Sequence, residues 1–176
     1  MIPPLLETSR LRLRLPSLDD AEAIFVGYAT DPEVTRYLSW RPHAKRADTY
    51  AFLHRTIAAI EARTEAQWVI QRRGLERPIG MIGFRLARHA AQLGYVLERA
   101  CWGRGYATEA AKAVVDWALA EPTIYRVWAV CDVEHRASAR VLEKVGMERE
   151  GVLRRGVMLP NLSAEPRDCW CYARVR

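Results

Sequence analysis

Hydrophobic and polar residues alternate strictly over residues 10–15, where arginine and leucine take turns along the chain. Because successive side chains of a strand point to opposite faces, this pattern predicts a first strand with leucines inside and arginines outside. Ser17, with Asp20 three residues later, is typical of a helix N-cap. Asp31 and Pro32 predict a second helix start, since a proline in the first turn has no hydrogen bond to lose.

Both periods continue through the rest of the chain. A third helix is predicted by apolar residues at helical spacing, namely Tyr50, Leu53, Ile57 and Ile60. Two further helices are predicted over residues 104–120 and 136–145, the second ended by Gly146. Strands are predicted at residues 68–72, 79–86, 92–97, 125–131, 148–157 and 169–174. This order predicts an α+β (mixed α/β) fold, and 176 residues predict a single domain over residues 1–176.

Composition narrows the class of protein. The net charge is +6, but the arginines are spread along the chain, and we find no contiguous basic face with interleaved aromatic residues. This argues against nucleic acid and leaves two readings of the charge, a solvated surface or an anionic small ligand. No apolar run approaches the ~20 residues needed to cross a bilayer, and the first residues lack the pattern of a secretion signal. We therefore expect a cytoplasmic protein without a membrane partner.

The four cysteines are too few and too scattered for a disulfide framework. Cys169 and Cys171 share one face of a predicted strand, which is not a zinc-binding spacing. We expect reduced, packed thiols and no metal site.

The most informative stretch covers residues 93–110, where a strand runs through a glycine-bearing turn directly into a helix. The first N–H groups of such a helix have no intrahelical partner, and the helix dipole adds partial positive charge there. Gly103, Gly105 and Ala107 are small enough for an anion to reach the backbone, and Arg104 adds a cation at the rim. The pattern indicates a phosphate or pyrophosphate site, with glycines that merely satisfy a tight turn as the alternative.

Two common glycine loops do not match this stretch. It has no Gly-Lys-Ser/Thr, which excludes a nucleoside-triphosphate P-loop. It also lacks Gly-x-Gly-x-x-Gly in a repeated parallel βαβ setting, which argues against a Rossmann site.

Residues 102–110, Trp-Gly-Arg-Gly-Tyr-Ala-Thr-Glu-Ala, resemble the coenzyme A loop of the GNAT superfamily of N-acetyltransferases. Within it the chain is similar to the ribosomal-protein N-terminal (RimJ/RimL-type) branch. The signature Gln/Arg-x-x-Gly-x-Gly/Ala falls on Trp102, Gly105 and Ala107, with Trp in a place where that branch often has it. The resemblance also covers residues 6–14, 31–34 and 132–147, so it extends over nearly the whole chain in the expected order.

The resemblance implies an acyl-CoA N-acyltransferase fold. Its mixed, mostly antiparallel sheet is splayed between the fourth and fifth strands, has helices on both faces and holds acetyl-coenzyme A in the gap. The pyrophosphate would contact the backbone of Gly103, Arg104, Gly105, Tyr106, Ala107 and Thr108. The pantetheine arm would pair with the strand backbone at Tyr95, Val96 and Leu97. The Leu97 N–H would polarise the thioester carbonyl.

Acetyl transfer also needs an acid for the departing thiolate and a base for the amine. For the acid, the resemblance implies Ser138, which shares a helix face with Val141, Leu142 and Val145; a serine bonded to its own helix backbone is the alternative. Two positions depart from the usual family pattern. Leu142 replaces the tyrosine that serves as acid in many members, and His135 replaces the asparagine that holds the pantetheine arm.

Candidates for the base and the acceptor site are less specific. Glu98 follows the coenzyme-pairing strand and could act through water, although a solvated glutamate at a strand end is the alternative. Glu7 and Glu33 lie where the family builds its acceptor wall, and Trp40 could line the same cleft. Glu109 is expected to bond a neighbouring loop. His43, His54 and His89 belong to no motif.

We therefore expect an acetyl-coenzyme A-dependent enzyme, monomeric or homodimeric, that acetylates a protein or peptide N-terminal amine in a ternary complex. A small amine such as an aminoglycoside, polyamine or amino acid is the alternative acceptor. A non-catalytic acetyl-coenzyme A sensor is the alternative of another class. An open cleft would favour the peptide, and a closed acidic pocket the small amine.

Overall fold

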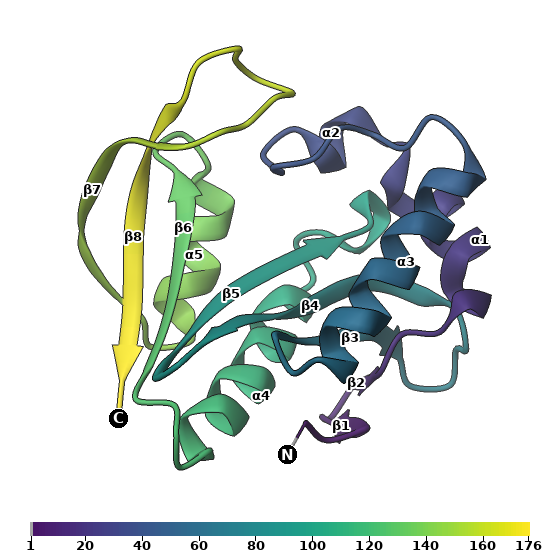
Figure 1. Cartoon of the computed structure of the whole chain (residues 1–176), viewed down its shortest axis with the longest axis horizontal. Coiled ribbons are helices and arrows are strands. Elements are labelled where there is room, and N and C mark those ends of the chain that lie inside the picture. Colours follow the sequence, from purple (N-terminus) through teal and green to yellow (C-terminus); the bar gives the residue numbers. More distant parts are fainter. Residues whose placement is uncertain (1) are drawn as a thin grey trace.

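One eight-stranded sheet organises the chain, and the computed structural model describes residues 2–176 (Figure 1). The strand order is β1-β2-β3-β4-β5-β6-β8-β7, and every neighbouring pair is antiparallel except β5 with β6, which is parallel. The strands are β1 (Leu5–Glu7), β2 (Leu11–Arg14), β3 (Glu65–Arg72), β4 (Pro78–Ala87), β5 (Ala90–Leu97), β6 (Arg126–Asp132), β7 (Glu148–Val157) and β8 (Arg167–Val175).

Helices cover both faces of this sheet, as the sequence predicted (Figure 1). The N-terminal helical segment consists of η1 (Leu18–Asp20), α1 (Ala21–Ile24) and η2 (Phe25–Ala29). The other helices are α2 (Pro32–Thr35), α3 (Arg46–Glu61), η3 (Arg99–Cys101), α4 (Tyr106–Ala120) and α5 (Arg136–Lys144). None of those that the structure describes is long and apolar enough to cross a membrane.

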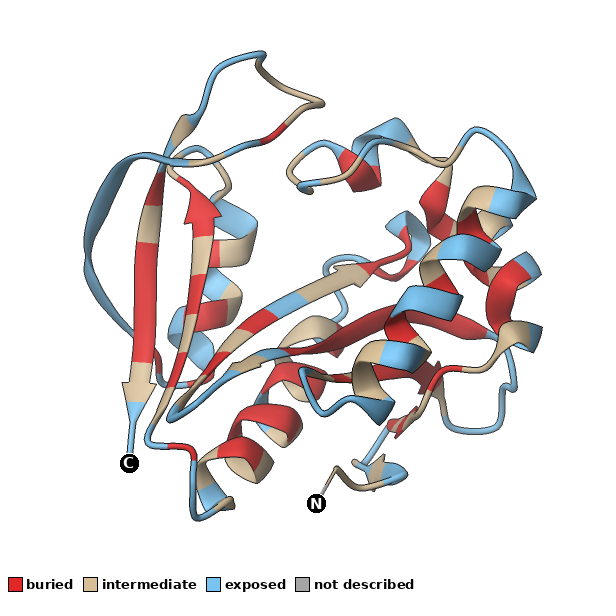
Figure 2. Ribbon diagram, in the orientation of Figure 1, coloured by how far each residue is buried: buried red, intermediate tan, exposed pale blue. Residues whose placement is uncertain are grey.

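The core forms two clusters of buried apolar side chains on opposite faces of the sheet. Figure 2 shows the buried residues in red along the strands and helices. The larger cluster joins α4 and α5 to the sheet and includes Trp68, whose ring meets Trp117 edge-on at a centroid distance of 5.2 Å. The smaller one joins α1, η2 and α3 to Val69 and Met81. Residues that alternate along β3 and β4 therefore serve different clusters, which is why these strands are apolar on both faces.

The feature that shapes the molecule is a splay between β5 and β6, the predicted fourth and fifth strands. Only three residue pairs join them, Ala90 with Arg126, Ala91 with Val127 and Gln92 with Trp128. Beyond Gln92 the strands diverge, so the rest of β5 has an unpaired edge that faces a gap (Figure 1). The predicted mixed sheet, splayed at this position, is thus confirmed.

Most of the predicted elements are present with shifted ends. Asp31 caps α2 by accepting the Glu33 N–H at 2.8 Å, and Ser17 donates its N–H to Asp20 at 2.8 Å. The short strand β1 was not predicted. The four cysteines are free and buried, as expected.

Two details of the predicted helices are wrong. Helix α4 begins at Tyr106 and not at residue 104, because Gly105 has a left-handed φ of 78° that no helical residue adopts. On α3 the buried face is Thr49, Leu53 and Thr56, whereas Tyr50 is 44% exposed. The apolar stripe misled here because threonine counts as polar in a sequence pattern, although Thr49 and Thr56 are buried.

Glu109 ties the loop between β1 and β2 to α4, the loop-bonding role expected for it. Its carboxylate accepts from the hydroxyls of Thr8 (2.6 Å) and Ser9 (3.1 Å), and from the N–H and guanidinium of Arg10 (2.9 and 2.6 Å). Burial acts to raise the pKa of Glu109, but these hydrogen bonds outweigh it and hold the pKa below the usual value.

We expect Glu109→Gln to destabilise the fold by roughly 1.5 kcal/mol at pH 7, the lower end for hydrogen bonds to a charged group. A lowered folded-state pKa stabilises the protein above the unfolded pKa of about 4.3 and loses this effect as pH falls. Denaturant unfolding of both proteins between pH 3 and pH 7 measures this. A difference that stays constant down to pH 3 would contradict the role of the charge.

Candidate functional site

The edge of β5 that borders the gap offers backbone groups from alternate residues. The Glu98 N–H bonds the Ile79 carbonyl of β4 at 2.8 Å, and the Val96 carbonyl also lies against β4, 2.3 Å from where a Gly80 Cβ would stand. In an antiparallel pair, the backbone N–H and C=O groups of the residues between these two point away from the partner strand. The N–H and C=O groups of Tyr95 and Leu97 therefore face the gap, whereas those of Val96 do not.

The glycine loop ends this strand and opens α4. Gly103 and Gly105 both have a left-handed φ, 72° and 78°, and no atom lies within 4 Å of a Cβ built on Gly103. The first helical bond runs from the Glu109 N–H to the Gly105 carbonyl at 3.0 Å, so the N–H groups of the three preceding residues are outside the helical ladder. The Trp102 indole N–H bonds the Leu97 carbonyl at 2.8 Å and ties the loop to β5.

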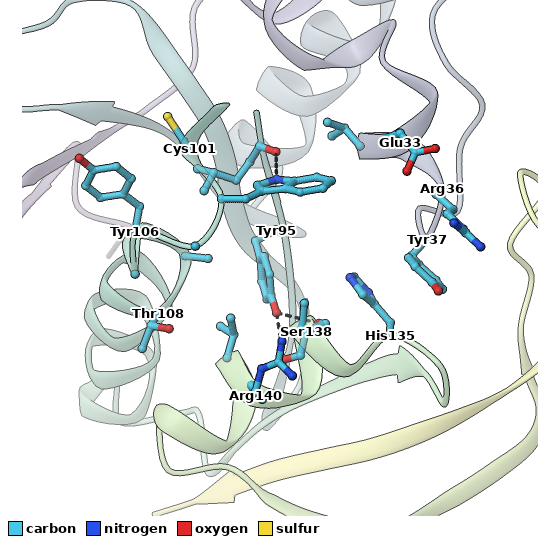
Figure 3. A pocket seen from close by; sticks show the side chains of 18 of the residues that line it. Glu33, Arg36, Tyr37, Tyr95, Cys101, Tyr106, Thr108, His135, Ser138 and Arg140 are labelled. Carbon is cyan, nitrogen blue, oxygen red and sulfur yellow. Dashed lines mark hydrogen bonds between the residues drawn. The ribbon is translucent and has the colours of Figure 1, made fainter. Parts of the chain in front are cut away.

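A cavity of about 470 Å³, here called the loop cavity, lies between this loop and α5 (Figure 3). Its wall includes Gly103, Gly105, Tyr106, Ala107 and Thr108 on one side and His135, Ser138, Arg140 and Lys144 on the other. Open helix N–H groups opposite two cations fit a ligand that carries several phosphates.

Arg140 and Lys144 were missed from the sequence, and Arg104, predicted as the rim cation, is exposed and absent from the lining. The two cations stand at i, i+4 and share a helical face with Ala137 and Val141, which also line the cavity, whereas the sequence argument used the face of Ser138.

Tyr95 and Ser138 meet inside the loop cavity (Figure 3). The two hydroxyl oxygens are 2.7 Å apart, although Tyr95 is on β5 and Ser138 on α5. Burial raises the pKa of Tyr95, so the phenol stays protonated. The sequence indicated only the backbone of Tyr95, since nothing local shows that its ring spans the gap. Leu142, predicted to share the buried face of α5, is core at 1% exposure.

His135, at the N-terminus of α5, stacks on Tyr37 across the loop cavity. The ring centroids are 4.1 Å apart and the planes differ by 8°. Burial lowers the pKa of His135, which leaves the ring neutral at pH 7. Tyr37 follows α2, so this stack joins the two sides of the gap.

A second cavity of about 640 Å³, here called the aromatic groove, runs between α3 and the sheet. Its inner end is lined by Tyr28, Trp40, His43 and Phe52, and its outer end by Arg55, Glu65, Gln67, Arg85 and Gln92. Leu38 and Tyr95 line both cavities, so the two meet at these residues. Gly94 lies on the floor, and no atom lies within 4 Å of a Cβ built there.

The other site residues predicted from the sequence lie in different parts of the structure. Trp40 lines the aromatic groove and Glu33 the loop cavity. Glu98 lines neither; it is 6% exposed, and its two oxygens accept from the Arg77 guanidinium at 2.7 and 2.8 Å. Glu7 is exposed beside Arg12 and Arg73, both at 3.7 Å, and lines neither of the two cavities. Among the residues that the structure describes, no cluster of His, Cys, Asp or Glu could hold a metal ion.

Comparison with known proteins agrees with this geometry. The family model for the acetyltransferase (GNAT) domain matches residues 10–148. The uncharacterized N-acetyltransferase YoaA of Bacillus subtilis (strain 168) is 36% identical over 154 residues, which cover 86% of each chain.

Two solved structures share the fold and contain the coenzyme. RimL, a ribosomal L7/L12 α-N-protein acetyltransferase in complex with coenzyme A, superposes with a TM-score of 0.86 at 20% identity and covers 99% of this chain and 97% of its own. The microcin C7 self-immunity acetyltransferase MccE, in complex with acetyl-CoA and AMP, has a TM-score of 0.85 at 20% identity, with 96% and 94% covered.

We expect Gly105→Glu to abolish binding of coenzyme A, because the new side chain would block the loop and repel phosphate. Titration calorimetry with coenzyme A measures this. Gly74→Glu is the matched control, since Gly74 has a φ of 81°, open space around it and a place in the distant β3–β4 turn. Retained affinity in Gly105→Glu, or an equal loss in Gly74→Glu, would contradict the assignment of the loop.

Proposed function

Because the chain belongs to the GNAT acetyltransferase family and is an acetyl-coenzyme A-dependent N-acetyltransferase, we propose that its acceptor is the N-terminal amine of a protein or peptide. The reaction joins two substrates, and the two cavities that meet at Leu38 and Tyr95 provide room for one each. On this proposal the loop cavity holds the donor and the aromatic groove the acceptor, in a cytoplasmic enzyme.

The observation that carries the acceptor proposal is the charge of the aromatic groove. Of its described lining residues, Glu65 is the one carboxylate, and it faces Arg85 at 3.8 Å with Arg55 nearby. Aminoglycosides and polyamines carry several positive charges, and a site for them needs a surplus of carboxylates. A groove with aromatic walls and a flat glycine floor suits instead an uncharged peptide segment behind a single amine.

The names of the structural neighbours indicate more than one kind of activity. RimL acts on a ribosomal protein N-terminus by its name, whereas MccE is named for immunity to microcin C7. At 20% identity the likeness of each shows the fold alone. The acceptor proposal therefore rests on the groove and not on these names.

The residues of the loop cavity fit the donor. The free N–H groups at the start of α4 would hold its pyrophosphate, with Arg140 and Lys144 as cations on the opposite wall. The gap-facing backbone of Tyr95 and Leu97 would take its pantetheine arm as an added strand. The donor supplies an activated acetyl thioester; the Leu97 N–H, at the same edge, would polarise its carbonyl.

We assign the acid to Ser138, positioned by Tyr95. The two hydroxyl oxygens are 2.7 Å apart, and in this assignment the phenol is the donor and the Ser138 oxygen the acceptor, which leaves the serine proton free for a departing thiolate. The tyrosine that other family members carry in place of Leu142 is absent here, and the Tyr95 ring brings a phenol to the same cavity from the opposite strand.

We expect Ser138→Ala to lower kcat about 10²-fold, at the lower end of general acid catalysis, with little change in coenzyme affinity. Tyr95→Phe should lower kcat about tenfold, since it removes only the group that orients the serine. The double variant should lose no more than Ser138→Ala alone, because both act through one proton. Steady-state kinetics and calorimetry on the four proteins measure this, and additive losses would contradict the arrangement.

The proposed acceptor is tested by thiol release from acetyl-coenzyme A with a panel of N-terminal peptides, aminoglycosides, polyamines and amino acids. We expect turnover with peptides whose first residues are uncharged. Turnover with a polyamine or aminoglycoside and none with peptides would overturn the acceptor. Tight donor binding without turnover on any acceptor would indicate a sensor.

Gly94→Val extends this test to the groove. The valine side chain fits the strand but fills the groove floor, so we expect KM for the peptide to rise at least tenfold while coenzyme affinity is unchanged. Gly151→Val is the matched control, because Gly151 is an exposed strand glycine with the same open space, on β7 and outside both cavities. An unchanged peptide KM in Gly94→Val would place the acceptor elsewhere.

A further inference from the structure

His43 is held rigidly at the inner end of the aromatic groove. Its Nδ1 is 2.7 Å from the hydroxyl of Thr49, which is fully buried on α3. Its backbone N–H bonds the Ala29 carbonyl at 2.8 Å, and its ring lies beside Trp40 and Phe52 at centroid distances of 5.1 and 6.0 Å. His43 is therefore held by a hydrogen bond of its ring, a hydrogen bond of its backbone and two ring contacts, which is more than a surface histidine usually has.

His43 lines the aromatic groove, the cavity that meets the loop cavity at Leu38 and Tyr95. Trp40, beside it, packs against the same apolar cluster as Val96 of β5, the strand whose neighbouring Tyr95 borders both cavities. Trp40 is itself fixed, because the Asn161 side chain donates to the carbonyls of Thr35 and Trp40, both at 2.7 Å. The histidine therefore lies beside a fixed wall of the cavity that is assigned to the acceptor amine.

The other possible proton acceptors are either paired with an arginine, far from Tyr95, or outside the groove. Glu98 is paired with Arg77 outside both cavities. Glu65 is opposite Arg85, whose partner on β5 is Gln92. Tyr95 is three positions further along that strand, about 10 Å away. Glu33 and His135 line the loop cavity and not the groove.

We propose that His43 is the proton acceptor for the amine, with Thr49 as the residue that positions it. In the required tautomer Nδ1–H donates to the Thr49 hydroxyl oxygen, and Nε2 keeps the lone pair that accepts the proton. This assignment rests on the proposed acetyl transfer but not on the acceptor being a peptide.

The proton balance of the reaction is met with one histidine. An acceptor arrives as an ammonium ion, and His43 removes one proton and passes it to solvent. The freed nitrogen lone pair forms the C–N bond to the acetyl carbon, and the C–S bond breaks with its electron pair left on sulfur. Ser138 gives its proton to the thiolate, and the second proton that the nitrogen loses returns to the Ser138 oxygen, so that the reaction releases one proton in total.

The surroundings keep His43 in the form that this step needs. Burial lowers its pKa, as does Arg55, while Asp48 opposes them. Arg55 and Asp48 are both on α3; Trp40, Phe52 and Ala29, which contact it from the loop, the helix and η2, are uncharged. At pH 7 the imidazole is therefore neutral and can accept a proton.

The test compares the pH dependence of kcat/KM in the wild type and His43→Gln, with the best amine of the acceptor panel. The glutamine can still donate to Thr49 but cannot take up a proton. We expect a loss of about 10²-fold at pH 6.5. The loss should shrink to less than tenfold at pH 9, where an N-terminal amine of pKa about 8 is already neutral. The KM for acetyl-coenzyme A should not change.

Control variants separate catalysis from structure. Thr49→Val should show a smaller loss with the same pH trend, and Thr49→Ser should restore activity. His54→Gln, on the exposed side of the same helix, should match the wild type. A wild-type profile in His43→Gln, or an equal loss at every pH, would overturn the proposal. If only a non-peptide amine reacts, the proposed acceptor fails, and the same profiles on that amine still decide the role of His43.

Discussion

The loss of backbone pairing between β5 and β6 after three residue pairs is the constraint on which the site depends. A continuous sheet would use the N–H and C=O groups of Tyr95 and Leu97 internally and leave no space between the strands. The splay instead exposes a strand edge in the middle of the protein, which normally costs free energy because each buried polar group needs a partner. One of these groups is already satisfied, since the Trp102 indole N–H bonds the Leu97 carbonyl. The rest suit a ligand that pairs like a strand.

Side chains hold the two sides of the splay together where the backbone does not. Tyr95 bonds Ser138, His135 stacks on Tyr37, and Asn161 from the β7–β8 connection bonds two carbonyls of the α2 region. Each of these contacts joins residues on opposite sides of the gap. Because these side-chain contacts fix the distance between the two sides, the gap has a defined width. The positioning of two substrates requires such a fixed width. The need to join the two sides of the gap also explains why a tyrosine on a strand and a serine on a distant helix share a hydrogen bond.

The two cavities differ in the charge of the groups that line them. The loop cavity combines helix N–H groups with Arg140 and Lys144, whereas the groove is lined by aromatic, apolar and uncharged polar residues, with Glu65 balanced by Arg85. The first arrangement attracts phosphate, and the second accepts a substrate with little charge of its own. His43 and Ser138 lie on different cavities, so removal of a proton from the amine and delivery of one to the thiolate are separated in space. One residue with a single pKa need not serve both steps.

Local patterns in the sequence determined the strands, the helix caps and the glycine loop, because these depend on neighbours a few residues apart. Alternation at residues 10–15, the Asp31 cap and the left-handed glycines before α4 are all of this kind. The family resemblance added the splay and the donor. The tertiary structure alone decided which polar residues meet: that the Tyr95 ring reaches Ser138, that Arg77 occupies Glu98, and that Thr49 fixes His43. The reason is physical, since a polar side chain takes its role from partners that folding brings near it, and those partners leave no periodic signal in the sequence.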